Sequence, residues 1–458
     1  MAKKHSVFLK EDECEGCTNC VKNCPTKAIR VHQGKATIKE DLCIDCAECI
    51  RTCEYHAKYT ETNLIGEIGK YYYPVALVPP SFYGQFESSI KPLKIVAALH
   101  DIGFKEVKDV ALAAEAISKK TVNFLNKNSG QYISSSCPVI VRLIKIMYPE
   151  LLGSLIPLKS PVELMAEKAR KDIIKKKNLK KEEIGIFLIT PCPAKFTTIN
   201  NPLGMDESFL NGAIAVDKIY EKIREKVDNI SIESEKFKNY NTPYLGIGWG
   251  QSGGEKNVLN NLSQIETLSI NGISRVKSVL EEISRNNIKG VKYFELTSCP
   301  EGCVGGILNV KNSYQAKYNI QKKLEAQKPE ISKQNYKFNF DLSGKFLPAE
   351  VGKLDDNITT AMEKLEQLEK EQEILPGLDC ASCGAPDCET LAEDIVNGKA
   401  SRTDCIFMLR KEIKDLADRI SSLTHELPPV MSENSTYVSD KEKEKREQIF
   451  KNKEVDKN

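Results

Sequence analysis

The sixteen cysteines of this 458-residue chain fall into three groups whose spacing suits metal ligation. Eight lie within the first 53 residues, four lie in three separate segments beside prolines, and four lie in a last group. Thiolates are the ligands of iron–sulfur clusters and of many zinc sites. Because no cysteine is left over, the pattern predicts an iron–sulfur protein that moves electrons.

The first eight cysteines repeat one spacing. C-x2-C-x2-C-x3-C occurs at Cys14, Cys17, Cys20 and Cys24 and again at Cys43, Cys46, Cys49 and Cys53. Pro25 follows the first copy, and Glu54 follows the second. The pattern resembles a bacterial two-cluster ferredoxin, and we expect such an α+β domain over residues 1–62. The resemblance implies that the fourth cysteine of each copy serves the other cluster. One 4Fe–4S cluster would then use Cys14, Cys17, Cys20 and Cys53, and another Cys24, Cys43, Cys46 and Cys49. Zinc is the alternative, although its sites are usually built from two short pairs.

The central part of the chain must position the next four cysteines. Apolar runs such as residues 74–78 and 184–189 read as strands, and they alternate with helical stretches such as 108–126 and 278–286. This alternation predicts an α/β domain with largely parallel strands over residues 68–345. Cys137, Cys192, Cys299 and Cys303 follow strand-like runs. Their spacing alone allows a zinc site or a plain cubane.

Three segments resemble the active-site signatures of FeFe hydrogenases. Residues 134–138 read S-S-S-C-P against the family's T-S-C-C-P, and residues 191–195 read P-C-P-A-K against P-C-x-x-K. Residues 295–306 match the first twelve positions of E-x-M-A-C-P-x-G-C-x-x-G-G at Glu295, Cys299, Gly302, Cys303 and Gly306. The glycine-rich stretch 246–254 also fits the family. Its spacing is wrong for a dinucleotide loop, which is the alternative interpretation.

The resemblance implies a specific cofactor, the H-cluster. Cys137, Cys192, Cys299 and Cys303 would hold its 4Fe–4S cubane. Cys303 would bridge to a diiron unit with carbonyl, cyanide and dithiolate-amine ligands. Lys195 would donate a hydrogen bond to a cyanide, the alternative being an ordinary surface lysine. Pro80 and Ser81 would line the far side of the diiron pocket. The implied reaction is the interconversion of dihydrogen with two protons and two electrons.

The chain departs from the family along the proton route. Ser136 stands where the family has a proton-passing cysteine, and a hydroxyl is a far weaker acid than a thiol. The family's first relay glutamate is matched by Glu115, but Ser118, Ile156 and Thr190 replace further family residues. Glu255 and Glu301 are two acids that could start another route. These losses resemble divergent hydrogenases regarded as dihydrogen sensors, so slow turnover is expected.

The last four cysteines form C-x2-C-x4-C-x16-C at Cys380, Cys383, Cys388 and Cys405. The pattern resembles a small 4Fe–4S domain, which we expect within a helical module over residues 346–428. With the ferredoxin pair it would give three accessory 4Fe–4S clusters. Apolar residues flank it in steps of three and four, at Val351, Leu354, Ile358, Ala361, Leu365 and Leu368 and at Ile406, Leu409, Ile413, Leu416, Ile420 and Leu423. Two amphipathic helices are predicted. They would pack as an intramolecular hairpin or, alternatively, form the seam of a homodimer. The polar residues 429–458 are predicted to be a charged, disordered tail.

Charge and composition limit the classes of function that the chain can have. A net charge of +2 gives no strong field for nucleic acid or an anionic membrane. A polar N-terminus and the lack of a long apolar run predict a cytoplasmic protein. The leading hypothesis is a slow, sensory FeFe hydrogenase, an oxidoreductase acting on hydrogen. Its expected partners are ferredoxin or a similar electron carrier, hydrogenase maturation proteins and a signalling partner. The alternatives are an ordinary ferredoxin-linked hydrogen-evolving enzyme and a non-enzymatic hydrogenase-like iron–sulfur scaffold. Lys195 and the glycine stretch argue against the scaffold.

Overall fold

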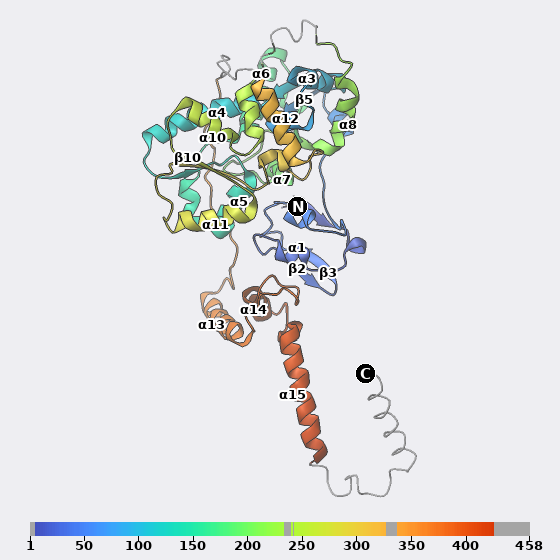
Figure 1. The fold of residues 1–458 in the computed structure, drawn as a ribbon, viewed down its shortest axis with the longest axis vertical. Helices are drawn as coiled ribbons and strands as arrows, with labels where there is room; N and C mark the ends of the chain where they lie inside the picture. Colours follow the sequence, from blue (N-terminus) through green and yellow to red (C-terminus); the bar gives the residue numbers. More distant parts are fainter. Residues whose placement is uncertain (1–4, 233–239, 241, 327–336, 426–458) are drawn as a thin grey trace. The chain divides into compact units, whose positions relative to one another are not determined.

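The computed structural model describes residues 5–232, 240, 242–326 and 337–425 (Figure 1). It divides the chain into two units. The first comprises Met1–Asp356 with Gly384–Pro386, and the second comprises Asn357–Cys383 with Asp387–Asn458. The domain limits expected from the sequence stay predictions, and the predicted tail lies outside the described residues.

The N-terminal part of the first unit is built from two similar halves. Strand β1 (Val7–Leu9) pairs antiparallel with β4 (Lys58–Thr60), and β2 (Ile29–His32) pairs antiparallel with β3 (Lys35–Ile38). Each half carries one short helix, α1 (Asn19–Lys22) or α2 (Glu48–Arg51). Both helices follow a residue in the left-handed region, Thr18 or Ala47. The repeated cysteine spacing is therefore matched by a repeated backbone path, and this part is α+β.

The first unit contains a four-stranded parallel sheet, of which Figure 1 labels strand β5. Its order is β6 (Glu106–Asp109), β5 (Tyr73–Val78), β8 (Ile184–Thr190) and β9 (Gly212–Ala215). Helices α3 (Pro92–Asp101), α8 (Val216–Val227) and α12 (Ser313–Glu325) contribute to the core on one face. Helices α4 (Val110–Lys127) and α6 (Pro161–Lys177) contribute to a second core on the other face of the sheet, together with the strand side chains that point to that face. Burial on both faces explains why β5 and β8 are almost continuously apolar.

A second, three-stranded sheet is also parallel. Its order is β10 (Thr267–Asn271), β11 (Tyr293–Thr297) and β7 (Tyr132–Ile133). Helices α5 (Pro138–Met147) and α11 (Ile273–Ser284) share a core cluster with this sheet. The prediction of an α/β domain with largely parallel strands is confirmed.

Each functional segment follows the carboxyl end of a strand. Cys192 follows β8, Cys137 follows β7, Cys299 follows β11, and Pro80 follows β5. Parallel strands bring their carboxyl ends to one edge of a sheet, where binding sites of α/β proteins form. The topology therefore gathers residues that are far apart in the sequence.

The second unit is helical in its described part. It contains α13 (Ile358–Ile374), α14 (Cys388–Val396) and α15 (Ile406–His425), and α13 packs against α14. Helix α13 begins at Ile358 because the Asn357 side chain accepts hydrogen bonds from the backbone N–H groups of Thr359 and Thr360. Val351 and Leu354 therefore precede the helix in which they were expected.

The hairpin expected from the sequence is not formed by the described residues. The six predicted seam side chains of α15 are each between 41% and 63% exposed. No helix in the described part of the chain is both long enough and apolar enough to cross a membrane.

Candidate metal centres

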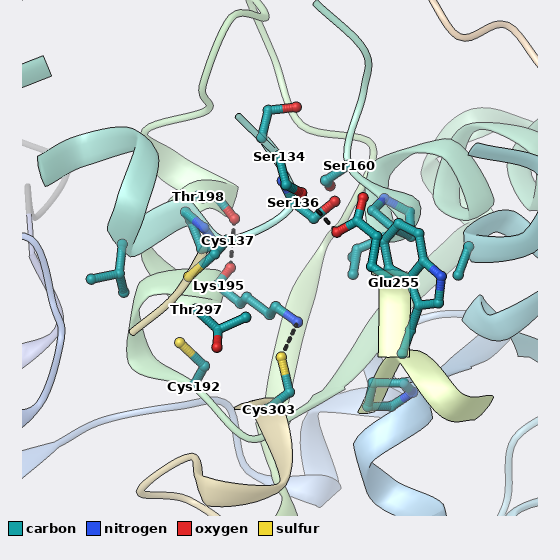
Figure 2. Close-up of a pocket in the computed structure, with 18 of the residues that line it drawn as sticks. Ser134, Ser136, Cys137, Ser160, Cys192, Lys195, Thr198, Glu255, Thr297 and Cys303 are labelled. Carbon is teal, nitrogen blue, oxygen red and sulfur yellow. Dashed lines mark hydrogen bonds between the residues drawn. The ribbon is translucent and has the colours of Figure 1, made fainter. Parts of the chain in front are cut away.

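The central cavity gathers four cysteines from three chain segments. Three of them, Cys137, Cys192 and Cys303, are labelled in Figure 2. The cavity has a volume of about 120 Å³, and Cys137, Cys192, Cys299 and Cys303 all line it. Cys137 and Cys192 directly precede α5 and α7 (Pro193–Asn200), and each helix begins with a proline. Proline suits this position because its missing N–H would have no helical partner. Two helix N-termini, which carry partial positive charge, thus begin beside the cavity.

The third segment turns sharply between its two cysteines. Glu301 and Gly302 both have left-handed backbone angles, with φ of +59° and +84°. A Cβ on Gly302 would lie 2.5 Å from the backbone nitrogen of Ser252. Glycine is therefore required for Cys299 and Cys303 to reach the same cavity.

Three thiols of the cavity have raised pKa values. Burial raises the pKa of Cys192 to about 12, and burial also raises the pKa of Cys137 and of Cys299. The neighbouring thiolates add to each of these shifts. A metal ion displaces thiol protons, because it binds the thiolate form.

Lys195 brings a cation to this group. Its Nζ lies 3.9 Å from the Sγ of Cys303 (Figure 2). Enclosure alone would lower the pKa of Lys195, but the four surrounding cysteines outweigh that effect and raise the pKa. A charged amine in such surroundings requires anionic partners. Lys195 is therefore not an ordinary surface lysine.

Several polar atoms on the cavity wall lack partners. Ser81 Oγ, Trp249 Nε1, Thr297 Oγ1 and Ser298 Oγ are buried and form no hydrogen bond within the described part of the chain. All four residues line the cavity, as does Pro80. Buried polar groups are normally paired. Their lack of partners fits a bound group that carries hydrogen-bond acceptors.

The wall beside Ser136 carries a buried carboxyl group, Glu255. Ser134 Oγ donates a hydrogen bond of 2.8 Å to Glu255 Oε2 (Figure 2). Tyr293 OH donates to Glu255 Oε1. The backbone N–H of Ser136 donates to Ser134 Oγ at 3.3 Å. Burial and the neighbouring Glu295 carboxylate raise the pKa of Glu255. Glu255 is therefore able to hold a proton at a higher pH than an ordinary glutamate.

Glu295 continues this polar wall. The backbone N–H groups of Gly253 and Lys256 each donate to its carboxylate at 2.9 Å. Ser269 also hydrogen-bonds Glu295, and Ser269 Oγ lies 3.4 Å from Ser252 Oγ. Both serines are partly exposed. Carboxyl and hydroxyl groups therefore extend from the cavity wall toward the surface.

The relay residues expected from the family do not gather at the cavity. Glu115 is buried and does not line it, and Glu115 Oε1 accepts a hydrogen bond from the Gly246 N–H at 3.1 Å. Ser118 donates to the Ala114 carbonyl, and Ile156 lies in the apolar core. Glu301 forms an ion pair with Lys317.

Thr190 has a local role beside a ligand. Its Oγ1 accepts from the Cys192 N–H at 3.1 Å and donates to the Cys192 carbonyl at 2.9 Å. Thr190 therefore fixes the backbone at the end of β8, at the point where Cys192 enters the cavity.

The eight N-terminal cysteines surround two smaller cavities. One is lined by Cys14, Cys17, Cys20 and Cys53, and the other by Cys24, Cys43, Cys46 and Cys49. These are the two ligand sets expected from the ferredoxin resemblance. Burial raises the pKa of Cys20 to about 11 and that of Cys49 to about 12.

A buried polar network joins the second of these cavities to the central one. Asp45 accepts from Arg142 Nη1 at 3.2 Å and from Thr197 Oγ1 at 2.7 Å. Arg142 lies on α5 and Thr197 on α7, the two helices that begin beside central-cavity cysteines. Arg51, two residues after Cys49, donates to the Gly305 carbonyl. The two cysteine groups are therefore held in a fixed relation.

The second unit carries the last cysteine group. Cys380, Cys383, Cys388 and Cys405 line one cavity. The Asp379 carboxylate accepts a hydrogen bond of 2.8 Å from the backbone N–H of Cys388. Asp379 and Ala381 adopt left-handed backbone angles, which allow the chain to turn around the cavity.

Comparison with known families agrees with this arrangement. Residues 72–257 match the family "Iron only hydrogenase large subunit, C-terminal domain". Residues 6–54 match the 4Fe-4S dicluster domain, and residues 375–407 match an Fe-S cluster family. Over residues 72–257 the chain is therefore similar to FeFe hydrogenases. Its iron–sulfur cluster domains are thus present at both ends of the hydrogenase-like segment.

Individual relatives of this FeFe hydrogenase-like protein are distant. Iron hydrogenase 1 of Clostridium pasteurianum is 23% identical over 255 residues, which are 46% of this chain and 44% of that protein. The chain thus matches less than half the length of this curated relative. The solved FeFe hydrogenase HydA1 of Chlamydomonas reinhardtii is 14% identical, with a TM-score of 0.41 over 56% of this chain and 83% of HydA1. A solved HydA(deltaEFG) structure is also 14% identical, with a TM-score of 0.42 over the same shares.

Proposed function

We propose that this FeFe hydrogenase-like protein slowly interconverts dihydrogen with protons and electrons and serves in the cytoplasm as a dihydrogen sensor. The observation that carries the proposal is one cavity lined by four cysteines, a lysine and several unpaired polar atoms. An ordinary cubane or zinc site needs the cysteines but has no use for Lys195 or for the additional polar wall.

The proposed cofactor is the H-cluster. Cys137, Cys192, Cys299 and Cys303 would hold its cubane, with Cys303 shared with the diiron unit. When bound, the H-cluster supplies the metal chemistry that joins two protons and two electrons as dihydrogen. Lys195 and Ser81 would donate hydrogen bonds to its ligands. Pro80 would restrict access of water from the β5 side of the cavity.

Electrons would enter through the cysteine groups outside the central cavity. The group of Cys24, Cys43, Cys46 and Cys49 is connected to α5 and α7 through Asp45, which supports transfer between neighbouring clusters. A ferredoxin or a similar small carrier is the proposed partner. Maturation proteins would insert the diiron unit, and a separate signalling partner would receive the output.

The proton supply supports slow turnover. Ser136 lines the cavity where a thiol would serve as a stronger acid. Among the described residues, Glu255 is connected to this position through Ser134 and the backbone of Ser136. We therefore assign the role of proton store to Glu255. The hydroxyl of Ser136 is the last group before the reacting site.

One observation favours a second candidate, an ordinary ferredoxin-linked hydrogen-evolving enzyme. Glu255 and Glu295 are two buried carboxyl groups with raised pKa, and together with Ser252 and Ser269 they extend from the cavity toward the surface. A complete proton path of this kind would support rapid evolution.

The deciding experiment is an infrared spectrum of the matured full-length protein together with its rate of dihydrogen evolution. Carbonyl and cyanide bands with slow evolution are expected, and Cys192→Ser should remove the bands because a hydroxyl is a poor iron ligand. Absence of bands after complete maturation would identify an iron–sulfur scaffold. Bands with rapid evolution from reduced ferredoxin would identify the ordinary enzyme.

A further inference from the structure

Helix α15 carries a narrow apolar row that no described residue covers. The row consists of Ile406, Leu409, Ile413, Leu416, Ile420 and Leu423, which we call the α15 stripe. Each of these side chains is between 41% and 63% exposed. Helices in water gain most of their stability by packing an apolar face. A 20-residue helix with such an exposed stripe therefore lacks a packing partner among the described residues.

The spacing of the stripe identifies the kind of partner. Helices that pack on a globular core show a broad apolar face, whereas steps of three and four alone are typical of a coiled-coil seam. The residues between them are mostly charged, with basic Arg410, Lys411 and Lys414 among acidic Glu412, Asp415 and Asp418. Mixed charges of this kind do not favour an anionic lipid surface, which attracts a uniformly basic face.

The residue types of the α15 stripe indicate how many helices the coiled coil contains. Isoleucine occupies every first position of the heptad (Ile406, Ile413 and Ile420), and leucine every fourth position. β-Branched residues at the first position with leucine at the fourth favour two-stranded parallel coiled coils. In that arrangement Glu412 would face Ala417 of the second copy. No like charges are opposed.

Helix α13, the expected hairpin partner of α15, already packs against another helix. Helix α13 packs against α14, and its Glu371 accepts a two-pronged hydrogen bond from Arg402, at 2.6 and 2.7 Å. Arg402 lies just before α15, so this contact fixes the start of α15 and leaves the stripe open. We propose that the α15 stripe is the seam of a parallel two-stranded coiled coil with a second copy of this chain.

The parallel arrangement has a consequence for the clusters. Cys405 directly precedes the first stripe residue, and Ile406 also lines the cavity of the last cysteine group. Parallel seams would bring the last cysteine groups of two chains to the same end of the coiled coil. In an antiparallel coil they would lie about 25 Å apart, because residues 406 and 423 are separated by seventeen steps of about 1.5 Å.

The first test measures mass. Full-length, cluster-loaded protein is analysed by sedimentation velocity at micromolar concentration under anaerobic conditions. The expected species has twice the chain mass of 51.3 kDa. Leu416→Lys places a charge at the centre of the seam and should raise the dimer dissociation constant at least about 100-fold. The matched control, Asp418→Lys, places the same residue on the outer face and should leave the dimer intact. Visible absorption by the clusters checks that both variants fold.

The second test measures orientation. Leu423→Cys lies at a seam position, and two copies of this cysteine meet only in a parallel coil. Mild oxidation should therefore yield a disulfide-linked dimer on a non-reducing gel. Asp418→Cys, on the outer face, should not cross-link. A wild-type monomer, or a Leu416→Lys variant that remains dimeric, overturns the proposal, and so does a dimer that Leu423→Cys fails to cross-link. These readouts are independent of dihydrogen chemistry.

Discussion

Glu255 and Glu115 are both buried glutamates, but only Glu255 lies on the wall of the central cavity. Ser134 joins Glu255 to the backbone of Ser136, while Glu115 holds the Gly246 N–H. Glu255 and Glu115 therefore belong to two different candidate proton routes, one through Ser134 and one expected from the family. The position of Glu255 on the cavity wall favours the route through Ser134.

Glu255→Gln should slow dihydrogen evolution by about 10²–10⁴-fold, because the amide keeps the shape but carries no acidic proton. Glu115→Gln should leave the rate nearly unchanged, because Gln accepts the same hydrogen bond from Gly246. The measurement is steady-state evolution with reduced ferredoxin, at equal diiron occupancy judged by infrared bands. Slowing by Glu115→Gln alone would restore the route expected from the family.

The central cysteines could be predicted at the level of residues, but their polar wall could not. The short signatures around Cys137, Cys192 and Cys303 are local patterns, so the resemblance locates them. Ser134, Glu255 and Tyr293 come from different elements, and Ser134 lies 121 positions before Glu255. Only the packing of β7, α10 (Gly254–Leu262) and β11 brings the three together. The one signal in the sequence was an acidic residue directly after the glycine stretch.

Elements were predicted best where burial dictates composition. The runs of β5 and β8 are apolar throughout, since parallel strands are covered on both faces. The first residues of helices were predicted less accurately. The predicted helix over 108–126 begins at Val110, because Asp109 ends β6 and its side chain accepts from the Ala111 N–H at 3.0 Å. The predicted hairpin failed because a heptad pattern specifies a seam but not its partner.

Cys388→Ser tests whether the last cysteine group is a separate element. Cys388 begins α14 within the helical unit and does not line the central cavity. The variant should lose the iron of one cubane and exchange electrons more slowly. The infrared bands of the active site should be unchanged. Iron analysis and infrared spectra check both expectations, with Cys192→Ser as the contrasting variant. Loss of the bands in Cys388→Ser would mean that the parts are not independent.

The whole molecule should hold about sixteen irons in four cubanes and about two more in the diiron unit. This total follows from four groups of four cysteines. Iron and sulfide analysis of matured protein provides the measurement. About fourteen or fewer irons in a fully loaded sample would show that at least one group binds another metal or none.

The stability of the folded chain should depend on Asp109. It is buried and accepts hydrogen bonds from Tyr83 OH at 2.6 Å and Tyr240 OH at 3.0 Å. Burial raises its pKa from 3.8 to about 6. The pKa of Asp109 is higher in the folded chain than in the unfolded chain. The stabilisation that protonated Asp109 gives the folded chain is therefore complete below the pKa of the unfolded chain. It is lost as the pH rises through about 6. The full difference is roughly 3 kcal/mol.

Asp109→Asn removes this titration. Its unfolding midpoint, relative to wild type, should rise by a few degrees between about pH 5 and about pH 8. The absolute midpoint is not diagnostic, because Asn accepts fewer hydrogen bonds than Asp. Thermal unfolding of both proteins followed by circular dichroism provides the comparison. A pH-independent difference between the two would exclude Asp109 as the titrating group.

The prolines after Cys137 and Cys192 affect the midpoint potential of a cubane in the central cavity. They begin α5 and α7, so the positive ends of two helices start beside the same cavity. Reduction makes a cubane more negative, and positive potential stabilises the reduced form. At about 0.3–1 kcal/mol for each helix end, the midpoint potential would rise by tens of millivolts. This shift would favour electron transfer from the ferredoxin clusters to the central cubane.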